Sequence, residues 1–365
     1  MGGWKGGTVS VGRAIEARLD RLKFDLKRRY GWFRPAEVRP YRGHGTAQAL
    51  YMKGRVLESR TIVPSSTTDT RRTNLLNMAR RFLSAEVPFA QVRGTFRGRE
   101  VTSVADAEGF FELRFEFPEP LEEKTAWHPV EAEILWPYED AGATATGRVL
   151  VPGGARFGVI SDLDDTVVQS SVTSLLKMLR TVLLHNAHTR LPFEGVASFY
   201  DALQRGSDPG TFNPIFYVSS SPWNLYDLLE DFLDVHGVPA GPLFLKDWGP
   251  TTLRGHEKHK LGVIRTLLST YPELPFVLIG DSGEKDPEIY HRVVRENPGR
   301  IQTIYIRDVT TRERDVAVRA IAREVCALGT EMLLVEDTAA AAEHAAANGL
   351  IFRDDLLPTV RRASG

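Results

Sequence analysis

The chain is poor in cysteine and has no long apolar run, and each absence excludes a class of protein. Cys326 is the one cysteine among 365 residues, which excludes an internal disulfide and a cysteine-rich zinc site and is typical of a reducing compartment. No stretch of about 18 apolar residues occurs, so we expect no segment to span a bilayer. The opening stretch "MGGWKGGTVSVGRAIEARLDRL" lacks the apolar core of a secretion signal. We therefore expect a cytoplasmic protein.

Net charge is also nearly absent. The formal charge is −1, with 46 Lys and Arg against 47 Asp and Glu, so the molecule as a whole is not expected to bind nucleic acid. Hydrophobic residues make up 42% of the chain and charged residues 25%, which is the composition of a globular protein. A chain of this length is long enough for two domains of ordinary size.

A basic amphipathic helix is predicted near the start of the sequence, over residues 9–30. Its apolar residues recur at spacings of three and four, which places them on one face, and the other face is rich in Lys and Arg. Two interpretations stay open: the apolar stripe packs on the body of the protein, or the helix makes peripheral contact with an anionic membrane. We treat residues 1–37 as a separate helical segment.

The next region, residues 38–152, consists mostly of predicted strands. The stretches "FFELRFEF" (110–117) and "VEAEILW" (130–136) alternate apolar and polar residues, as in an antiparallel sheet with one face in water. One helix is predicted at 73–85, where Thr73 caps the stretch "TNLLNMARRFLSA". We predict a β-sandwich domain in which no group of catalytic residues stands out.

From residue 153 to residue 365 the pattern is that of an α/β domain. Short runs that are apolar on both faces alternate with helical segments, which favours a parallel sheet. These runs are "FGVISD", "PIFYVSSS", "LPFVLIGD", "IQTIYIRD" and "EMLLVEDT". They lead into Asp, Ser or Thr, and open α/β sheets bind ligands beyond the carboxyl ends of their strands. A polar site is therefore expected at that edge.

Two acidic motifs follow such runs. The motif "DLDDT" carries Asp162, Asp164 and Asp165, and "GDSGEKD" carries Asp281 and Asp286. Carboxylates this close repel one another unless a cation or hydrogen-bond donors lie among them. The first motif lacks the Gly turn and distal Glu of a calcium loop, and a helix cap needs one Asp rather than three. Hard oxygen ligands with few other donors favour Mg²⁺.

Two further motifs supply groups that suit a phosphate. In "FYVSSSPWN" Ser219 ends a strand, and Ser221 and Pro222 are the predicted start of a helix, where hydroxyl and N–H groups bind anions. In "GHEKHK" either Lys258 or Lys260 brings a positive charge ahead of the next helix. We favour Lys260 because the apolar residues after it place it at the helix start, and Lys258 stays an alternative.

In this order the four motifs resemble the signature of the haloacid dehalogenase-like phosphohydrolases. The longer strings are "DLDDTV", "FYVSSSPWNLYDLL", "GHEKHKLGVI" and "FVLIGDSGEKDPEIY". They are similar to the catalytic domain of the actin-patch type of phosphatidate phosphatase, a family of fungi with bacterial members. The resemblance covers residues 155–310, and "VRPYRGHGT" (38–46) is similar to the lead-in of the bacterial members. A proline-rich tail for actin-patch partners is not seen, so no cytoskeletal role is expected.

The resemblance implies a fold and a set of roles. The fold is a parallel Rossmann-like haloacid dehalogenase core with a small cap, preceded here by the antiparallel β-sandwich domain and the N-terminal helix. Asp162 is implied to attack phosphorus, and Asp164 to act as general acid and base. Mg²⁺, the implied cofactor, is bound by Asp162, Asp164, Asp281 and Asp286. The catalytic set includes Lys260, and the implied substrate contacts are Thr166, Ser219, Ser220, Trp223, Asn224 and Lys258.

The segment between the first two motifs bears on the choice of substrate. The stretch "TSLLKMLRTVLLHN" (173–186) has a broad apolar face and a narrower polar one. This helix either covers the sheet as core or accepts acyl chains at a membrane surface. The leading hypothesis is a Mg²⁺-dependent phosphatidate phosphatase that forms diacylglycerol and phosphate through an aspartyl-phosphate. The alternatives are a phosphatase of soluble phosphomonoesters and a non-catalytic binding or scaffold protein.

Overall fold

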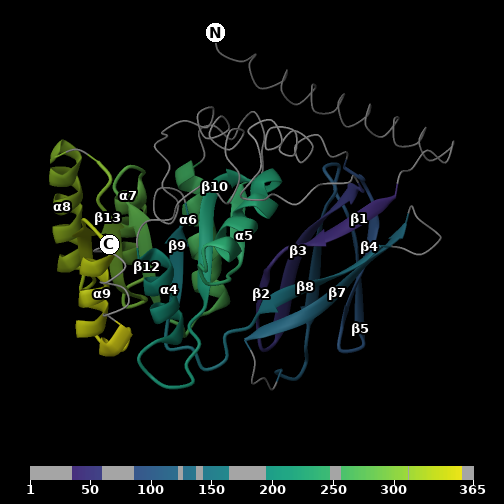
Figure 1. The fold of residues 1–365 in the computed structure, drawn as a ribbon, viewed down its shortest axis with the longest axis horizontal. Coiled ribbons are helices and arrows are strands. Elements are labelled where there is room, and N and C mark those ends of the chain that lie inside the picture. Colours follow the sequence, from purple (N-terminus) through teal and green to yellow (C-terminus); the bar gives the residue numbers. More distant parts are fainter. Residues whose placement is uncertain are drawn as a thin grey trace, which may run out of the picture. The chain divides into compact units, whose positions relative to one another are not determined.

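The computed structural model combines an antiparallel sheet with a parallel sheet, in agreement with the predicted mixture of helices and strands (Figure 1). It describes residues 35–59, 86–121, 126–136, 143–163, 195–246, 256–310 and 312–355. The helices predicted at 9–30, 73–85 and 173–186 lie outside these described residues. Within the described ranges, no helix is both long enough and apolar enough to cross a membrane.

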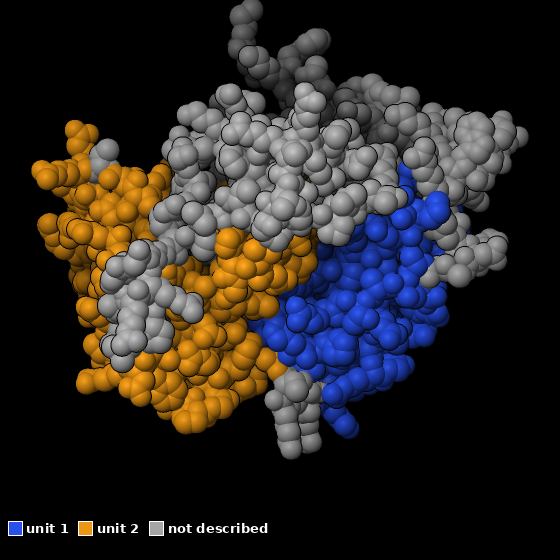
Figure 2. All heavy atoms as spheres, in the orientation of Figure 1, with its two compact units in different colours: residues 1–62, 83–122, 127–151 blue, residues 63–82, 123–126, 152–365 orange. Residues whose placement is uncertain are grey.

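The chain divides into two compact units (Figure 2). Unit 1 comprises Met1–Ile62, Leu83–Glu122 and Trp127–Val151, and unit 2 comprises Val63–Phe82, Glu123–Ala126 and Pro152–Gly365. The antiparallel sheet belongs to unit 1 and the parallel sheet to unit 2. Both acidic motifs of the sequence therefore fall in unit 2.

Unit 1 contains one sheet of antiparallel character. Its strands are β1 (Ala36–Pro40), β2 (Gly43–Thr46), β3 (Ala49–Glu58), β4 (Gln91–Phe96), β5 (Arg99–Val104), β6 (Phe110–Glu116), β7 (Trp127–Trp136) and β8 (Thr144–Leu150). Their order is β1-β3-β2-β8-β7-β4-β5 with β6 paired to β3, and β2 pairs with β8 in parallel. In β6 the side chains of Phe111, Leu113 and Phe115 are buried and those between them are exposed, so the predicted alternation gives one buried and one wet face.

Unit 2 contains a six-stranded parallel sheet. Its strands are β9 (Gly158–Asp162), β10 (Ile215–Pro222), β11 (Leu243–Lys246), β12 (Phe276–Asp281), β13 (Ile301–Arg307) and β14 (Glu331–Val335), in the order β11-β10-β9-β12-β13-β14. Every residue of β9 and β12 is buried, as in a sheet covered on both faces. The chain runs outward from β9 to β11, returns to β12 and continues the other way to β14. The strand order therefore reverses between β9 and β12, and open parallel sheets bind ligands at such a reversal.

Helices connect these strands. They are α4 (Val196–Arg205), α5 (Tyr226–Val235), α6 (His256–Thr270), α7 (Asp286–Glu296), α8 (Arg312–Ala327) and α9 (Thr338–Ala347), with short 3₁₀ turns η2 (Trp223–Leu225) and η4 (Arg353–Asp355). Along the sheet α7 packs between α6 and α8, whereas α4 packs against α9. Pro287 lies in the first turn of α7, where a missing N–H costs nothing. Asp286, the first residue of α7, lies five residues after the end of β12 and accepts a hydrogen bond from the backbone N–H of Asp281, so it lies at the carboxyl edge of the sheet.

Candidate active site

The carboxyl ends of three neighbouring strands bring the predicted motifs together. β9 lies between β10 and β12, and Val218 of β10 is directly opposite Asp162 of β9. Ser219 follows Val218, and Asp281 ends β12 on the other side of β9. Asp162 and Asp281, which end their strands, and Ser219, near the end of β10, therefore meet at one edge of the sheet, at the reversal of strand order.

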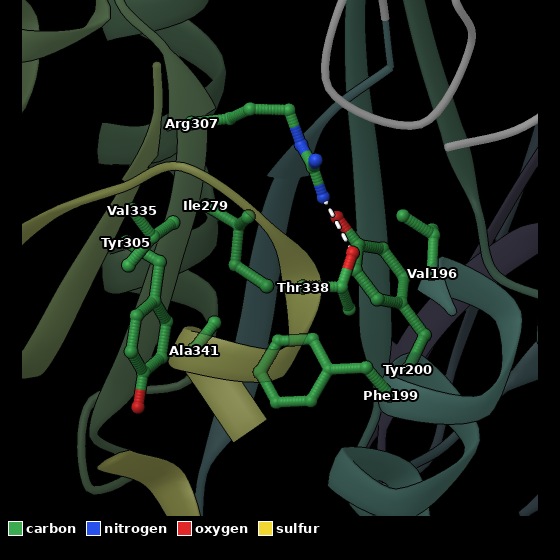
Figure 3. Close-up of a pocket in the computed structure, with 9 residues that line it drawn as sticks. All are labelled: Val196, Phe199, Tyr200, Ile279, Tyr305, Arg307, Val335, Thr338 and Ala341. Atoms are coloured by element: carbon green, nitrogen blue, oxygen red, sulfur yellow. Dashed lines mark hydrogen bonds between the residues drawn. The ribbon is translucent and has the colours of Figure 1, made fainter. Parts of the chain in front are cut away.

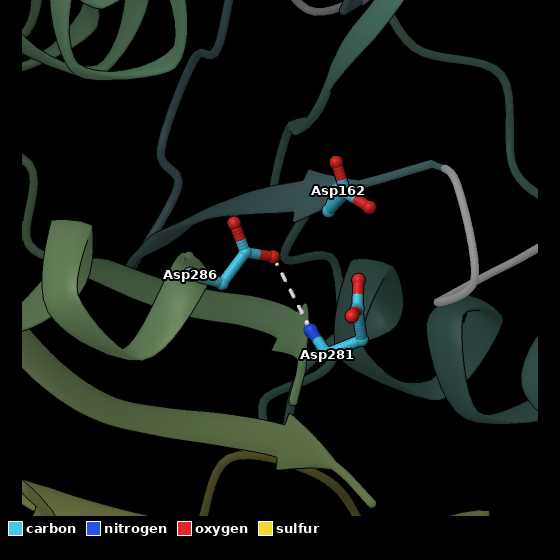
Figure 4. Close-up of side chains that lie close together, drawn as sticks. All are labelled: Asp162, Asp281 and Asp286. Atoms are coloured by element: carbon cyan, nitrogen blue, oxygen red, sulfur yellow. Dashed lines mark hydrogen bonds between the residues drawn. The ribbon is translucent and has the colours of Figure 1, made fainter. Parts of the chain in front are cut away.

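Three buried carboxylates form a cluster at this edge (Figure 4). Asp162, Asp281 and Asp286 each contribute an oxygen, and these oxygens lie within 4.8 Å of one another. All three residues are essentially inaccessible to solvent. Buried like charges at this separation destabilise one another unless a cation lies among them. Their spacing allows one divalent cation to contact all three, so the cluster is a candidate metal site.

The carboxylate of Asp281 fits a metal ligand in detail. Its Oδ1 accepts hydrogen bonds from the backbone N–H groups of Gly283 at 2.7 Å and Glu284 at 2.8 Å. Its Oδ2 is buried, and no described residue donates a hydrogen bond to it. A buried acceptor without a donor is costly, and a cation would satisfy it. The residues present therefore fit a hard divalent ion such as Mg²⁺.

Electrostatics around Asp281 lead to the same conclusion. Burial raises the pKa of Asp281 to about 7, the negative charge of Asp286 adds to the increase, and the hydrogen bond from the Glu284 backbone and the charge of Lys260 oppose it. The ionised form of the Asp281 carboxyl group is therefore unfavourable in the protein without a bound metal ion. A divalent cation bound to Asp281, in addition to the charge of Lys260, would remove the cost of ionisation, because it compensates for both burial and repulsion.

Gly280 allows Asp286 to join the cluster. The backbone N–H of Asp281 donates to Asp286 Oδ2 at 3.2 Å, which folds the Asp286 side chain back over the end of β12. A Cβ atom at position 280 would lie 2.2 Å from Asp286 Oδ2, so any side chain there would displace the carboxylate. Position 280 therefore has to be glycine, because the last Asp of the motif "GDSGEKD" approaches it closely.

Lys260 is the cation within the cluster. Its Nζ lies 2.9 Å from Asp162 Oδ1 and 3.1 Å from Glu284 Oε2, and it also pairs with Asp286. Burial by itself lowers the pKa of Lys260, but the charges of Asp162, Asp286 and Glu284 outweigh burial and raise its pKa well above the ordinary value. The ammonium group therefore stays charged beside Asp162. Lys258, the alternative, is exposed on the same helix.

The other predicted substrate contacts surround the end of β10. Ser219 is buried and its Oγ accepts a hydrogen bond from the backbone N–H of Ser221 at 3.0 Å. Ser220, Trp223 and Asn224 are half-buried. The predicted helix start at Ser221 is wrong, because β10 continues through Pro222 and the regular helix α5 begins at Tyr226, after the turn η2. Asp164, Asp165 and Thr166 lie outside the described residues.

The structure also brings in residues that the motifs did not single out. Glu284 lies inside the second acidic motif and contacts Lys260, although only the two Asp residues of that motif were selected from the sequence. Tyr290 is buried beneath the site and its hydroxyl donates to the backbone oxygen of Ile279 at 2.9 Å. Arg314 on α8 contacts the loop between β12 and α7, and no local pattern in the sequence could have revealed this contact.

A small cavity lies on the same sheet but does not suit a substrate (Figure 3). Its lining is mostly apolar and includes Phe199, Tyr200 and Tyr305, with the guanidinium of Arg307 donating to Thr338 Oγ1 at 2.7 Å. Its volume of about 20 Å³ is close to that of a single water-sized probe. A phosphomonoester does not fit in this cavity.

The structure has a parallel sheet with a buried carboxylate cluster that fits a divalent cation. Comparisons with known proteins relate this part of the chain to a family of phosphatases. Residues 157–308 match the family model of the catalytic domain of phosphatidate phosphatase APP1. The resemblance inferred from the motifs is therefore confirmed for this segment. It contains Asp162, Ser219, Lys260, Asp281 and Asp286.

Two curated proteins are each similar to part of the chain. Phosphatidate phosphatase APP1 of Saccharomyces cerevisiae is 34% identical over 165 residues, which is 44% of this chain and 27% of that protein. An uncharacterized protein of Schizosaccharomyces pombe is 30% identical over 158 residues, which is 42% of this chain and 25% of that protein. The chain thus aligns with about a quarter of the length of each relative.

Proposed function

We propose that the protein is a Mg²⁺-dependent phosphatidate phosphatase that hydrolyses phosphatidate to diacylglycerol and phosphate. One observation carries this proposal: a buried cluster of three carboxylates and one lysine at the reversal of strand order, inside the segment that matches a phosphatidate phosphatase catalytic domain. The substrate class comes from the name of the yeast relative. Phosphatidate is an anionic membrane lipid, so the proposal includes a cytoplasmic protein in peripheral contact with an anionic membrane.

The carboxylates supply both the cation site and the nucleophile. We assign Mg²⁺ to Asp162 and Asp281, with Asp286 and the backbone of Asp164 as further contacts that the family resemblance implies. When bound, Mg²⁺ neutralises negative charge on the phosphoryl oxygens and on the carboxylates, so that an anionic substrate can approach. Asp286 also keeps Lys260 and the backbone of Asp281 in place through its two contacts.

In the first step the Asp162 carboxylate attacks phosphorus. A bond forms between an Asp162 oxygen and phosphorus, and the bond between phosphorus and the glycerol oxygen breaks. The leaving alkoxide takes a proton from Asp164 and departs as diacylglycerol, so that Asp164 acts as general acid. The product on the protein is an aspartyl-phosphate, which divides one slow hydrolysis into two faster steps.

In the second step water hydrolyses the aspartyl-phosphate. Asp164, now ionised, takes a proton from water as general base, and the water oxygen attacks phosphorus. The bond between phosphorus and Asp162 breaks, which releases phosphate and regenerates the carboxylate. Lys260, 2.9 Å from Asp162 Oδ1, and Ser219 would bind phosphoryl oxygens as charge spreads over them. Trp223 and Asn224 lie beyond Ser219 and would contact the rest of the substrate.

The proposal extends to the finer architecture. The strand order of unit 2 and the Asp residues that end β9 and β12 support a haloacid dehalogenase-like core with a small cap. A β-sandwich in unit 1 is supported by Gly94 of β4, where an added Cβ would lie 2.6 Å from Leu113 of β6. These two strands are not neighbours in the sheet, so they face each other across a core. We keep the boundaries 1–37, 38–152 and 153–365 as proposed domains.

The test of this function is phosphate release from phosphatidate in detergent micelles, with Mg²⁺ and with a chelator. We expect phosphate release to fall by about 100-fold or more when the cation is removed and to recover when Mg²⁺ is added back. The reason is that the cation stabilises the charge of the transition state by several kcal/mol. A panel of sugar and nucleotide phosphates serves as control. Faster release from those soluble esters than from phosphatidate would favour a soluble-monoester phosphatase, and no release from any ester would refute the proposal.

A further inference from the structure

We propose that Arg314 is a positioning residue that holds the acidic loop, residues 282–285, and the first turn of α7 in the conformation that binds the cation. This inference rests on the proposed function, because it concerns the same metal site. Arg314 belongs to α8 and lies beyond the segment that matches the family model, which ends at residue 308. Its hydrogen bonds are to Ser282, Glu284 and Glu288, so we infer that it acts through the loop and not on the substrate.

The guanidinium of Arg314 donates hydrogen bonds to three residues of the loop and of the first turn of α7. Its Nε donates to the backbone oxygen of Ser282 at 3.0 Å, and its Nη2 donates to the backbone oxygen of Glu284 at 2.9 Å. Its Nη1 and Nη2 donate to the two carboxylate oxygens of Glu288 at 2.7 and 2.9 Å. One planar fork thus binds the beginning and the middle of the loop together with the first turn of α7.

Each of these contacts is made with a residue that is close in the chain to a proposed metal ligand, Asp281 or Asp286. The Ser282 oxygen belongs to the same peptide unit as the N–H of Gly283, which donates to Asp281 Oδ1. The Glu284 oxygen belongs to the residue whose own N–H donates to the same Asp281 oxygen. The Arg314 fork therefore holds the backbone that orients the Asp281 carboxylate. Glu288 is two residues after Asp286 on α7, so the ion pair fixes the end of the helix from which Asp286 projects. Residues that orient metal ligands in this way tune metal affinity.

A second set of contacts joins the loop to the chain just before α8. Ser282 Oγ lies 2.9 Å from Thr310 Oγ1 and accepts a hydrogen bond from the backbone N–H of Val309 at 3.0 Å. The N–H of Ser282 donates to the backbone oxygen of Arg307 at 2.9 Å. The end of β13 and the residues before α8 therefore contact the first residue of the loop. Arg314 also contacts the residues that follow, Glu284 and Glu288.

Charge alone predicts the opposite effect on metal binding. The guanidinium is a cation near Asp281, and its field acts on that carboxylate. By Coulomb's law a nearby cation disfavours Mg²⁺, so removal of Arg314 would strengthen binding if electrostatics were its only role. If Arg314 orders the ligands, its removal weakens binding instead. The sign of the change in affinity therefore separates positioning from electrostatics.

The experiment is calorimetric titration of the full chain with Mg²⁺, comparing the wild type with Arg314→Ala and Arg314→Lys. We expect the dissociation constant to rise by about 10-fold in Arg314→Ala, and by less in Arg314→Lys, which keeps the charge but not the fork. Arg319→Ala is the matched control, since Arg319 is exposed on the same helix and its loss should leave affinity unchanged. Unchanged or tighter binding by Arg314→Ala would overturn the inference.

Two further measurements keep the outcomes distinct. If Arg314→Ala does not fold, Glu288→Gln removes the ion pair but keeps both backbone contacts, and we expect the dissociation constant to rise by a few-fold; no rise would count against the inference. In activity assays the Mg²⁺ concentration for half-maximal rate should rise while the rate at saturating Mg²⁺ is largely kept. Weaker Mg²⁺ binding by the variants, in a protein that does not act on phosphatidate, would refute the proposed function and leave the role of Arg314 intact.

Discussion

Replacement of Asp162 by asparagine is expected to abolish phosphate release from phosphatidate, with a loss of roughly a thousandfold or more. An amide is a poor nucleophile, so the covalent step cannot proceed at a useful rate. The same substitution removes a charged ligand from the cation cluster, where Asp162 lies with Asp281 and Asp286. Both effects act in the same direction, which makes this the largest change in activity that the site predicts.

The fold should survive this substitution. Asn is nearly the same size as Asp, and it removes one of three crowded negative charges while Lys260 keeps Asp286 and Glu284 as partners. The circular dichroism spectrum should therefore match that of the wild type. Asp354→Asn is the matched control, because Asp354 is exposed and the same chemical change there should leave the rate unaltered. Residual activity of Asp162→Asn within tenfold of wild type would show that another group attacks phosphorus.

Replacement of Lys260 by methionine is expected to produce the largest loss of stability. Lys260 is 3% exposed and is surrounded by Asp162, Asp286 and Glu284. Removal of the cation leaves buried carboxylates without compensation, which costs about 3–5 kcal/mol in the free energy of unfolding. Urea denaturation of the protein without Mg²⁺ measures this loss. Added Mg²⁺ should recover part of it, because the metal replaces the missing positive charge.

Lys285→Met provides the control for that experiment. Lys285 is 71% exposed and lies 3.6 Å from Glu257, and ion pairs at the surface contribute about 0–1 kcal/mol. We therefore expect little change in its urea midpoint. Equal, small effects of the two substitutions would mean that the carboxylates around Lys260 are protonated in the folded protein, and the charged cluster described above would then not exist.

Much of the site could be predicted from the sequence for a simple geometric reason. Runs that are apolar on both faces predict parallel strands, and parallel strands bring their carboxyl ends to one edge. Asp162, Ser219 and Asp281 each end or follow such a run, so their meeting could be expected from chain order. The alternation within "FFELRFEF" similarly predicted the buried face of β6. In both cases the information is local and repeats along the strand.

The remaining features depend on contacts that no local pattern encodes. The preference for Lys260 over Lys258 rested on two following apolar residues, and only the path of α6 shows which ammonium reaches Asp162. Proline suits both the first turn of a helix and the end of a strand, so the sequence predicts a helix start at Pro222, whereas Pro222 ends β10 in the structure. Arg314 contacts a loop about thirty residues earlier, and an arginine on a helix is usually a surface residue.

The most direct test of the central claim is the anomalous difference map of a crystal soaked in Mn²⁺, which takes the same oxygen ligands as Mg²⁺. The account predicts one strong peak between the carboxylates of Asp162 and Asp281, in contact with Asp281 Oδ2. A map with no peak there, or with manganese bound only elsewhere on the protein, would contradict the claim that these carboxylates exist to hold a divalent cation.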